Sequence, residues 1–244
     1  MSSILPSLWE RIASAQPAPP AWVVAVTGLA ALLLVLNTAV WRLAGQVITI
    51  AHEGGHALVS LLSGRRLEGI RLHADSSGVT YSRGKRHGPG LALTAAAGYP
   101  APSLLGAGAA ALLATRHPTA LLWLALILLA ATFLAVRNAF GALAVLTTAA
   151  GVFAVSYFAS AAVQAGFAYL AAWFLLLGGM RPALELTRAR RRGSRARLSD
   201  ADQLARLTGV YRGAWIALFL LICIAALALG TRLLIPLRHP LRHP

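Results

Sequence analysis

Residues 48–62, ITIAHEGGHALVSLL, place three ionisable side chains in an otherwise apolar segment. Glu53 is the only formally charged residue among them, with His52 and His56 on either side. Lipid solvates such groups poorly, so ionisable residues in membrane-length apolar segments usually face a functional cavity. On a helix, side chains four residues apart project from the same face. The segment therefore predicts a buried helix that carries a functional site.

The spacing of these three side chains is that of a zinc site. Two histidine nitrogens one helical turn apart can bind the same zinc ion. Glu53 is rotated by about 100° from His52, so its carboxylate is better placed to reach a water than the metal. A carboxylate there can act as general base in amide hydrolysis. We therefore expect His52 and His56 as ligands of one Zn²⁺ per chain, and Glu53 as the catalytic residue.

The composition indicates a membrane protein. Of the 244 residues, 58% are hydrophobic and 12% are charged, whereas soluble domains usually carry about 25% charged residues. Seven nearly uncharged segments reach the roughly 18 residues needed to span a bilayer. They are residues 21–41, 43–64, 90–115, 118–136, 139–157, 158–180 and 214–231. We expect an all-α polytopic protein of about seven transmembrane helices in contact with the lipid bilayer.

A β-hairpin is expected over residues 67–82, after the second predicted helix. Ile70 and Leu72 alternate with polar residues, residues 75–78 supply turn formers, and alternation resumes at Val79. With this hairpin, the chain divides into four regions. These are a cytoplasmic lead-in (1–20), a membrane core with the HExxH motif (21–180), a basic loop with a short helix (181–213), and a last transmembrane helix with its tail (214–244).

The positive charge is concentrated in two loops. The net charge is +15, and of 22 Lys and Arg residues six lie in residues 65–86 and nine in residues 181–212. Loops rich in Lys and Arg remain in the cytoplasm, so we expect residues 65–89 and 181–213 on the cytoplasmic side. No aromatic interleaving and no nucleic-acid-binding module accompany the charge, which argues against nucleic acid as a partner. The sequence gives no indication of the oligomeric state.

Several of these features together resemble the site-2 protease class of intramembrane zinc metalloproteases, in particular its bacterial M50B-like branch. They are HEGGH in a membrane-length segment, the hairpin that follows it, and a Gly-Tyr-Pro sequence in the next segment. The likeness covers residues 43–157. His56 lies nine residues before Arg65, about 13 Å along a helix, which agrees with a metal inside the bilayer. The resemblance implies an endopeptidase of the bacterial plasma membrane that cleaves transmembrane protein substrates.

The resemblance also suggests residues for substrate binding. Members of the class typically carry a Gly-Pro-x-x-Asn element in the helix after the hairpin. Here Gly98 and Pro100 are separated by Tyr99, and Ser103 stands in place of the asparagine. The likeness implies that Gly98, Pro100 and Ser103 contact the substrate.

The identity of the third zinc ligand is open between three alternatives. The class supplies it from an aspartate in a Leu-Asp-Gly element, but Asn138 occupies the matching place here. An amide is neutral and binds zinc less well than a carboxylate. Asp200, in SDADQLA, is the alternative, because the M50B-like branch resembles this chain there too. Helix capping explains Asp200 and Asp202 without any metal, so Asp200, Asn138 and neither residue all stay open.

The departures from the family pattern leave two functions open. The first is a zinc-dependent intramembrane endopeptidase that cleaves peptide bonds by metal-activated water. The alternative is a membrane protein with a site-2-protease-like scaffold that binds metal or a partner without proteolysis. A third metal ligand, an oxygen atom near His52 and His56, would favour the endopeptidase, and its absence would favour the non-proteolytic protein.

Overall fold

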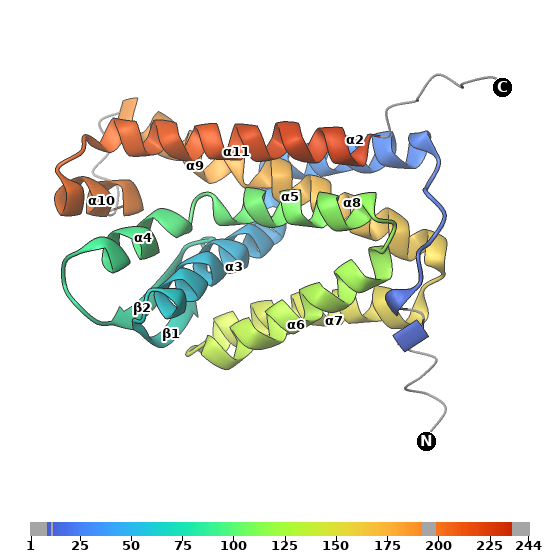
Figure 1. The fold of residues 1–244 in the computed structure, drawn as a ribbon, viewed down its shortest axis with the longest axis horizontal. Helices are drawn as coiled ribbons and strands as arrows, with labels where there is room; N and C mark the ends of the chain where they lie inside the picture. Colours follow the sequence, from blue (N-terminus) through green and yellow to red (C-terminus); the bar gives the residue numbers. More distant parts are fainter. Residues whose placement is uncertain (1–8, 11, 192–198, 236–244) are drawn as a thin grey trace.

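The computed structural model describes residues 9–10, 12–191 and 199–235 and is mostly helical, with one two-stranded hairpin (Figure 1). Its elements, labelled as in Figure 1, are α2 (Ala21–Leu36), α3 (Thr38–Leu62), β1 (Arg66–Leu72), β2 (Gly78–Arg83), α4 (Pro89–Ala97), α5 (Ala101–Ala114), α6 (Pro118–Ala135), α7 (Ala139–Phe158), α8 (Ala161–Gly178), α9 (Met180–Arg191), α10 (Asp200–Thr208) and α11 (Arg212–Leu234).

Several of these helices are long and apolar enough to cross a membrane, so the chain is an integral membrane protein. Four candidate spans occur in the described residues, and a fifth is obtained if the bent pair α2–α3 counts as one. The four are Pro118–Ala135, Ala139–Phe158, Ala161–Arg188 and Arg212–Leu234. A polytopic helical protein is thus confirmed, whereas the expected number of seven spans is not.

The first two predicted spans differ from the structure at their boundary. The helices α2 and α3 meet at Asn37, five residues before the expected break at Arg42, and are bent by 104°. Asn37 has extended backbone angles, and its side-chain oxygen accepts hydrogen bonds of 3.0 Å from the backbone N–H groups of Ala39 and Val40. This is an N-cap, which satisfies two of the donors that a new helix leaves unpaired. The cap, not the charge of Arg42, decides where the second helix begins.

The third predicted span is also interrupted. Residues 90–115 form α4 and α5, of nine and fourteen residues, with a turn at residues 98–100 between them. Pro100 has no backbone N–H and its ring clashes with the preceding turn of a helix, so a continuous helix is broken there. Neither piece reaches the length of a spanning helix. The turn instead lies against the face of α3 that carries the histidines.

The predicted hairpin is confirmed as an antiparallel pair of β1 and β2. Its turn is anchored to α3 by two polar side chains. Gln46 donates a hydrogen bond of 3.0 Å to the carbonyl oxygen of His73, and Thr49 donates one of 3.0 Å to that of Ser76. Residues that precede the HEGGH motif on α3 therefore fix the hairpin beside that motif.

The outer edge of β1 is covered by the loop between α6 and α7. Val136 forms a parallel bridge with Ile70, and the N–H of Arg137 donates to the carbonyl of Ile70 at 2.8 Å. Asn138 continues this pairing with its side chain, whose amide donates to the carbonyl of Leu72 at 2.7 Å and accepts from its N–H at 3.2 Å. The loop thus behaves as a short third strand.

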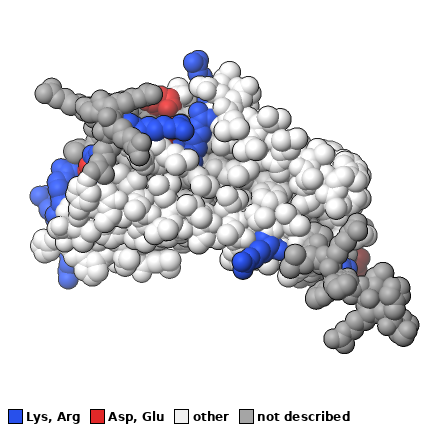
Figure 2. Space-filling model, turned by 90° about the horizontal axis from the view of Figure 1, so that it is seen from above, with Lys and Arg blue, Asp and Glu red and all other residues white. Residues whose placement is uncertain are grey.

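The centre of the bundle is packed from α2, α5, α8 and α11. Small residues allow close approach there: at Gly106 and Gly230 an added Cβ would collide with Leu176 on α8. Close packing of this kind stabilises helix association in lipid, where the hydrophobic effect contributes little. On the face seen in Figure 2, uncharged residues dominate and Lys and Arg gather toward one end. That end carries α10 and the hairpin (Figure 1).

Candidate metal centre

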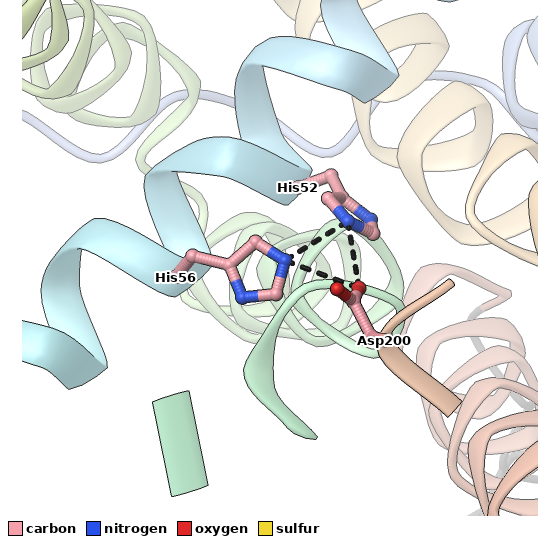
Figure 3. A group of neighbouring side chains, drawn as sticks. All are labelled: His52, His56 and Asp200. Atoms are coloured by element: carbon pink, nitrogen blue, oxygen red, sulfur yellow. Dashed lines mark hydrogen bonds and ion pairs between the residues drawn. The ribbon is translucent and has the colours of Figure 1, made fainter. Parts of the chain in front are cut away.

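Three side chains from two distant parts of the chain meet at one point. His52 and His56 project from α3 toward the carboxylate of Asp200, the first residue of α10 (Figure 3). The Nε2 atoms of the two histidines are 3.1 Å apart, and each lies 3.2 Å from Oδ2 of Asp200. Within the residues that the structure describes, no other three His, Cys, Asp or Glu side chains bring donor atoms within 4.8 Å of one another.

The separations of these atoms suit a small tetrahedral ion. Donors at about 2.0–2.2 Å from a tetrahedral zinc stand about 3.3–3.6 Å from one another, close to the observed 3.1–3.2 Å. The chain also leaves room beside them. Gly98, in the turn between α4 and α5, lies so close that an added Cβ would collide with Nε2 of both His52 and His56. Both the donor set and the space beside it therefore fit a metal ion.

A backbone carbonyl determines the tautomer of His56. Its Nδ1 lies 2.6 Å from the carbonyl oxygen of Thr94 on α4. A carbonyl can only accept, so Nδ1 carries a proton and donates it to Thr94. The Nε2 lone pair of the neutral ring is then directed at the donor cluster. Hydrogen bonds of this kind orient metal-binding histidines and increase their basicity.

Aromatic contacts hold the other histidine. The ring of His52 meets the ring of Tyr99 edge-on, with centroids 4.9 Å apart and an interplanar angle of 81°. Tyr99 in turn stacks on Phe219 of α11, with centroids 5.2 Å apart. Edge-to-face geometry of this kind is favourable between aromatic rings. The middle residue of the Gly-Tyr-Pro turn thus connects His52 to α11.

Asp200 is presented by a short helix that is fixed at its first turn. Ser199 and Asp202 form a capping box, in which the Ser199 hydroxyl accepts from the N–H of Asp202 and the Asp202 carboxylate accepts from the N–H of Ser199. Asp202 also pairs with Arg212 of α11 at 2.7 Å. On the other face of α10, Leu204 is fully buried against α4 and α11. Asp202 therefore anchors the helix, while Asp200 faces the histidines.

The histidines keep Asp200 ionised. Burial by itself would raise the pKa of this carboxyl group. When no metal is bound and their Nε2 atoms carry protons, His52 and His56 donate hydrogen bonds and lend positive charge to Asp200, which outweighs the effect of burial and holds the pKa of this carboxyl well below its ordinary value. The carboxylate is thus in the charged form that a metal ligand requires.

Glu53 lies beside this cluster, facing the hairpin. Its side chain is 4% exposed, and its Oε2 accepts a hydrogen bond of 2.6 Å from the hydroxyl of Thr80 on β2. Gly78 leaves space for Glu53, since an added Cβ there would lie 2.6 Å from its Oε1. The hairpin therefore sets the position of the carboxylate that the sequence assigns to catalysis.

The remaining predicted residues lie in different surroundings. Asn138 is not part of the donor cluster, because both ends of its amide bind the backbone of Leu72. Pro100 is the N-cap residue of α5, at the turn. Ser103 is fully buried, and its hydroxyl faces the carbonyl of Leu176 on α8 at 3.4 Å. At Gly98 an added Cβ would collide with the histidine nitrogens. The role of these three residues in substrate binding stays a prediction.

Three contributors to the site were not predicted from the sequence. Thr94 acts through its carbonyl group, which every residue type possesses, so no sequence signal could reveal it. Thr80 offers a weak signal, as a hydroxyl in the strand that follows a buried glutamate. Tyr99 lies inside the Gly-Tyr-Pro sequence already singled out, and its aromatic ring beside two histidines could have been recognised.

No curated protein and no solved structure matches this chain. The model of one family, described as Peptidase M50B-like, matches residues 25–230. This range includes both histidines, the hairpin, the Gly-Tyr-Pro turn and Asp200. The match covers most of the 244 residues, and the chain belongs to the Peptidase M50B-like family.

Proposed function

We propose that this protein is a zinc-dependent intramembrane endopeptidase that cleaves peptide bonds of transmembrane protein substrates. In this proposal one zinc ion is held by His52, His56 and Asp200. The observation that carries it is the meeting of three donor atoms within 3.1–3.2 Å of one another. Membership of a peptidase family supports the same reaction class.

The donor set has the composition of a catalytic zinc site. Two imidazoles and one carboxylate leave a fourth position open for water or substrate, whereas structural zinc sites are closed by four protein ligands. When bound, zinc supplies a Lewis acid that polarises a carbonyl oxygen and makes a water more acidic. Gly98 is consistent with an open fourth position, because it has no side chain that could fill the space beside the two histidines.

Glu53 is the proposed general base. It would take a proton from the attacking water and deliver it to the amine that leaves when the peptide bond breaks. The hydrogen bond from Thr80 to Oε2 orients the carboxylate and leaves Oε1 available for proton transfer. Thr80 thus serves as a positioning residue for Glu53.

The hairpin is the proposed binding element for an unwound substrate segment. The edge of β1 is already taken by residues 136–138, which leaves β2 as the edge for strand addition. Since Thr80 on β2 also contacts Glu53, a peptide added there would run close to the base.

The orientation in the membrane is a proposal too. The end of the molecule that carries the hairpin and α10 is rich in Lys and Arg, and such loops stay in the cytoplasm. Residues 65–89 and 181–213 would then be cytoplasmic. By family resemblance the membrane would be the bacterial plasma membrane.

A second candidate is a non-proteolytic membrane protein that binds metal or a partner with the same scaffold. The observation that favours it is the contact between Glu53 and Thr80, which ties one carboxylate oxygen to the hairpin. In this alternative, Glu53 would stabilise the hairpin and have no part in a reaction.

One experiment tests both candidates. The zinc content of purified protein is measured together with cleavage of a peptide that contains a transmembrane segment and a fluorophore–quencher pair. An endopeptidase binds one zinc per chain, and Glu53→Gln keeps the zinc but loses cleavage. Glu185→Gln, at an exposed position on α9, is the matched control and should retain both. Cleavage that survives Glu53→Gln, or a wild-type preparation without stoichiometric zinc, would contradict the proposal.

A further inference from the structure

A polar hollow lies at the base of the hairpin, away from the histidines. It has a volume of about 430 Å³ and is lined by Arg66, Leu67, Glu68, Arg83 and Arg137. These residues come from β1, β2 and the loop between α6 and α7. We propose that this arginine pocket binds the phosphate headgroup of an anionic phospholipid. The proposal is independent of the proteolytic function.

The charges in the pocket favour an anion. Three guanidinium groups face one carboxylate, and only the pair between Arg83 and Glu68, at 2.9 Å, neutralises part of the excess. In the described part of the chain, the guanidinium of Arg66 forms no hydrogen bond or ion pair. The net excess of two positive charges exceeds the single negative charge of a phosphodiester. One guanidinium group can donate two parallel hydrogen bonds to the oxygens of a phosphate, which adds geometric selectivity to the attraction between the charges.

Arg137 is held with part of its guanidinium still available. Its Nη1 donates to the carbonyl oxygens of Leu134 and Val136, at 2.6 and 3.0 Å, at the C-terminus of α6. The other guanidinium nitrogens form no hydrogen bond or ion pair within the described residues. This arrangement fixes the arginine at the end of a spanning helix while leaving donors for a ligand.

The surroundings of the pocket indicate a lipid rather than a soluble phosphate. Leu134 on α6 and Leu62 at the end of α3 are 75% and 77% exposed, and both adjoin pocket-lining segments in the sequence. Apolar side chains this exposed on membrane helices face acyl chains, and arginines at the helix ends extend to the headgroup level. A cationic hollow beside an exposed apolar surface thus matches both halves of an anionic phospholipid.

Binding of three probes to the purified full-length protein in neutral detergent tests this inference. The probes are phosphatidylglycerol, phosphatidylcholine with the same acyl chains, and inorganic phosphate, each followed by native mass spectrometry and by competition with a fluorescent phosphatidylglycerol. We expect phosphatidylglycerol to bind at least about tenfold more tightly than phosphatidylcholine. Each arginine near an anionic headgroup increases the binding affinity about fivefold. Inorganic phosphate in large excess should not displace the fluorescent lipid.

Substitutions in the pocket should weaken or strengthen phosphatidylglycerol binding according to the charge that they remove. Arg66→Gln combined with Arg83→Gln should weaken phosphatidylglycerol binding about 25-fold and leave phosphatidylcholine binding unchanged. Glu68→Gln should strengthen phosphatidylglycerol binding by up to about fivefold, a gain that damage to the fold cannot produce. Arg232→Gln, in the last turn of α11 at the other end of the molecule, is the matched control and should change nothing.

Four results would overturn the inference. Equal binding of the two phospholipids would remove the requirement for an anion. Displacement of the lipid by inorganic phosphate would identify a soluble anion as the ligand. A loss with Arg232→Gln as large as that of the double variant would show that general surface charge is responsible. Weaker binding by Glu68→Gln would show that the charge balance of the pocket does not control lipid binding.

Discussion

The helices α3 and α10 both supply donors to the candidate metal centre, yet they are built in different ways. α3 spans 25 residues and carries two donors, which helical periodicity places on one face. α10 has nine residues and carries one donor, whose position depends on a capping box, one ion pair and one buried leucine. In the first case the local fold fixes the geometry, and in the second the tertiary contacts do.

This difference indicates how substitutions in the two halves of the site should affect metal binding. A change that blocks the face of α3 removes the site altogether, because no other cluster of donors in the described residues can replace these two. A change in the attachment of α10 weakens the third donor by degrees, because each contact contributes only part of the docking energy.

Gly98→Ala should abolish stoichiometric zinc binding. The added methyl group would occupy the space against Nε2 of both His52 and His56, where a metal must lie. Zinc content after dialysis measures the effect. Gly151→Ala, in α7 with open space around it, is the matched control and should retain the metal. Full zinc content in Gly98→Ala would mean that the metal lies elsewhere.

Asp200→Asn should lower the zinc affinity about a hundredfold without abolishing binding. The amide has nearly the shape of the carboxylate but no charge, so His52 and His56 would hold the ion with a weak third donor. A competitive titration against a chelator of known affinity measures the change. Unaltered affinity would rule out Asp200 as a ligand.

Asp202→Asn should weaken zinc binding about tenfold, since the residue positions α10 without touching the donors. Burial raises the pKa of the Asp202 carboxyl, but hydrogen bonds from Arg212 and Ser199 prevail, so the pKa lies below its ordinary value of 3.8. A lowered carboxyl pKa stabilises the fold above the ordinary value and ceases to do so as pH falls through the lowered one.

Thermal unfolding of metal-free protein at several pH values tests this sign. The difference in unfolding free energy between wild type and Asp202→Asn should be about 1 kcal/mol above about pH 5 and should shrink below the ordinary pKa. A difference that grows with acidity would contradict the anchoring role.

Ser199→Ala should have the smallest effect, weakening zinc binding a few-fold. The substitution removes one side of the capping box, which is worth about 1 kcal/mol of helix stability, while the pair between Asp202 and Arg212 persists. The same chelator titration measures it. A loss as large as that of Asp200→Asn would show that α10 docks as a single cooperative unit and that its contacts do not act in increments.

The part of the site that depends on local periodicity could be predicted from the sequence. The spacing of His52 and His56 and the alternation in residues 67–82 each indicate a structure within one element, and the fold bears out both elements. Asp200 could only be named as one of several possibilities. It meets residues about 150 positions earlier in the chain through packing of α10 on α4 and α11, and hydropathy carries no such information.

The number of spans could not be predicted because hydropathy measures apolar length and not the direction of the chain. Residues 21–41 and 90–115 are apolar throughout. The backbone nevertheless changes direction inside each range, at the capped break at Asn37 and at the turn that ends at Pro100. Both breaks carry local signals, an N-capping asparagine and a proline after a glycine. Weighed against apolar length, these signals would have brought the expected number of spans closer to the structure.

The hydrogen bond from His56 to Thr94 has a consequence for genetic screens. Its acceptor is a peptide oxygen, so Thr94 can be exchanged for any residue that preserves α4 without removing the bond. A saturation library would therefore register position 94 as tolerant of residues small enough for its buried place, although its own carbonyl oxygen orients a proposed metal ligand. Replacing the peptide unit after Thr94 by an ester, which makes its carbonyl a poorer acceptor, would expose the contact directly.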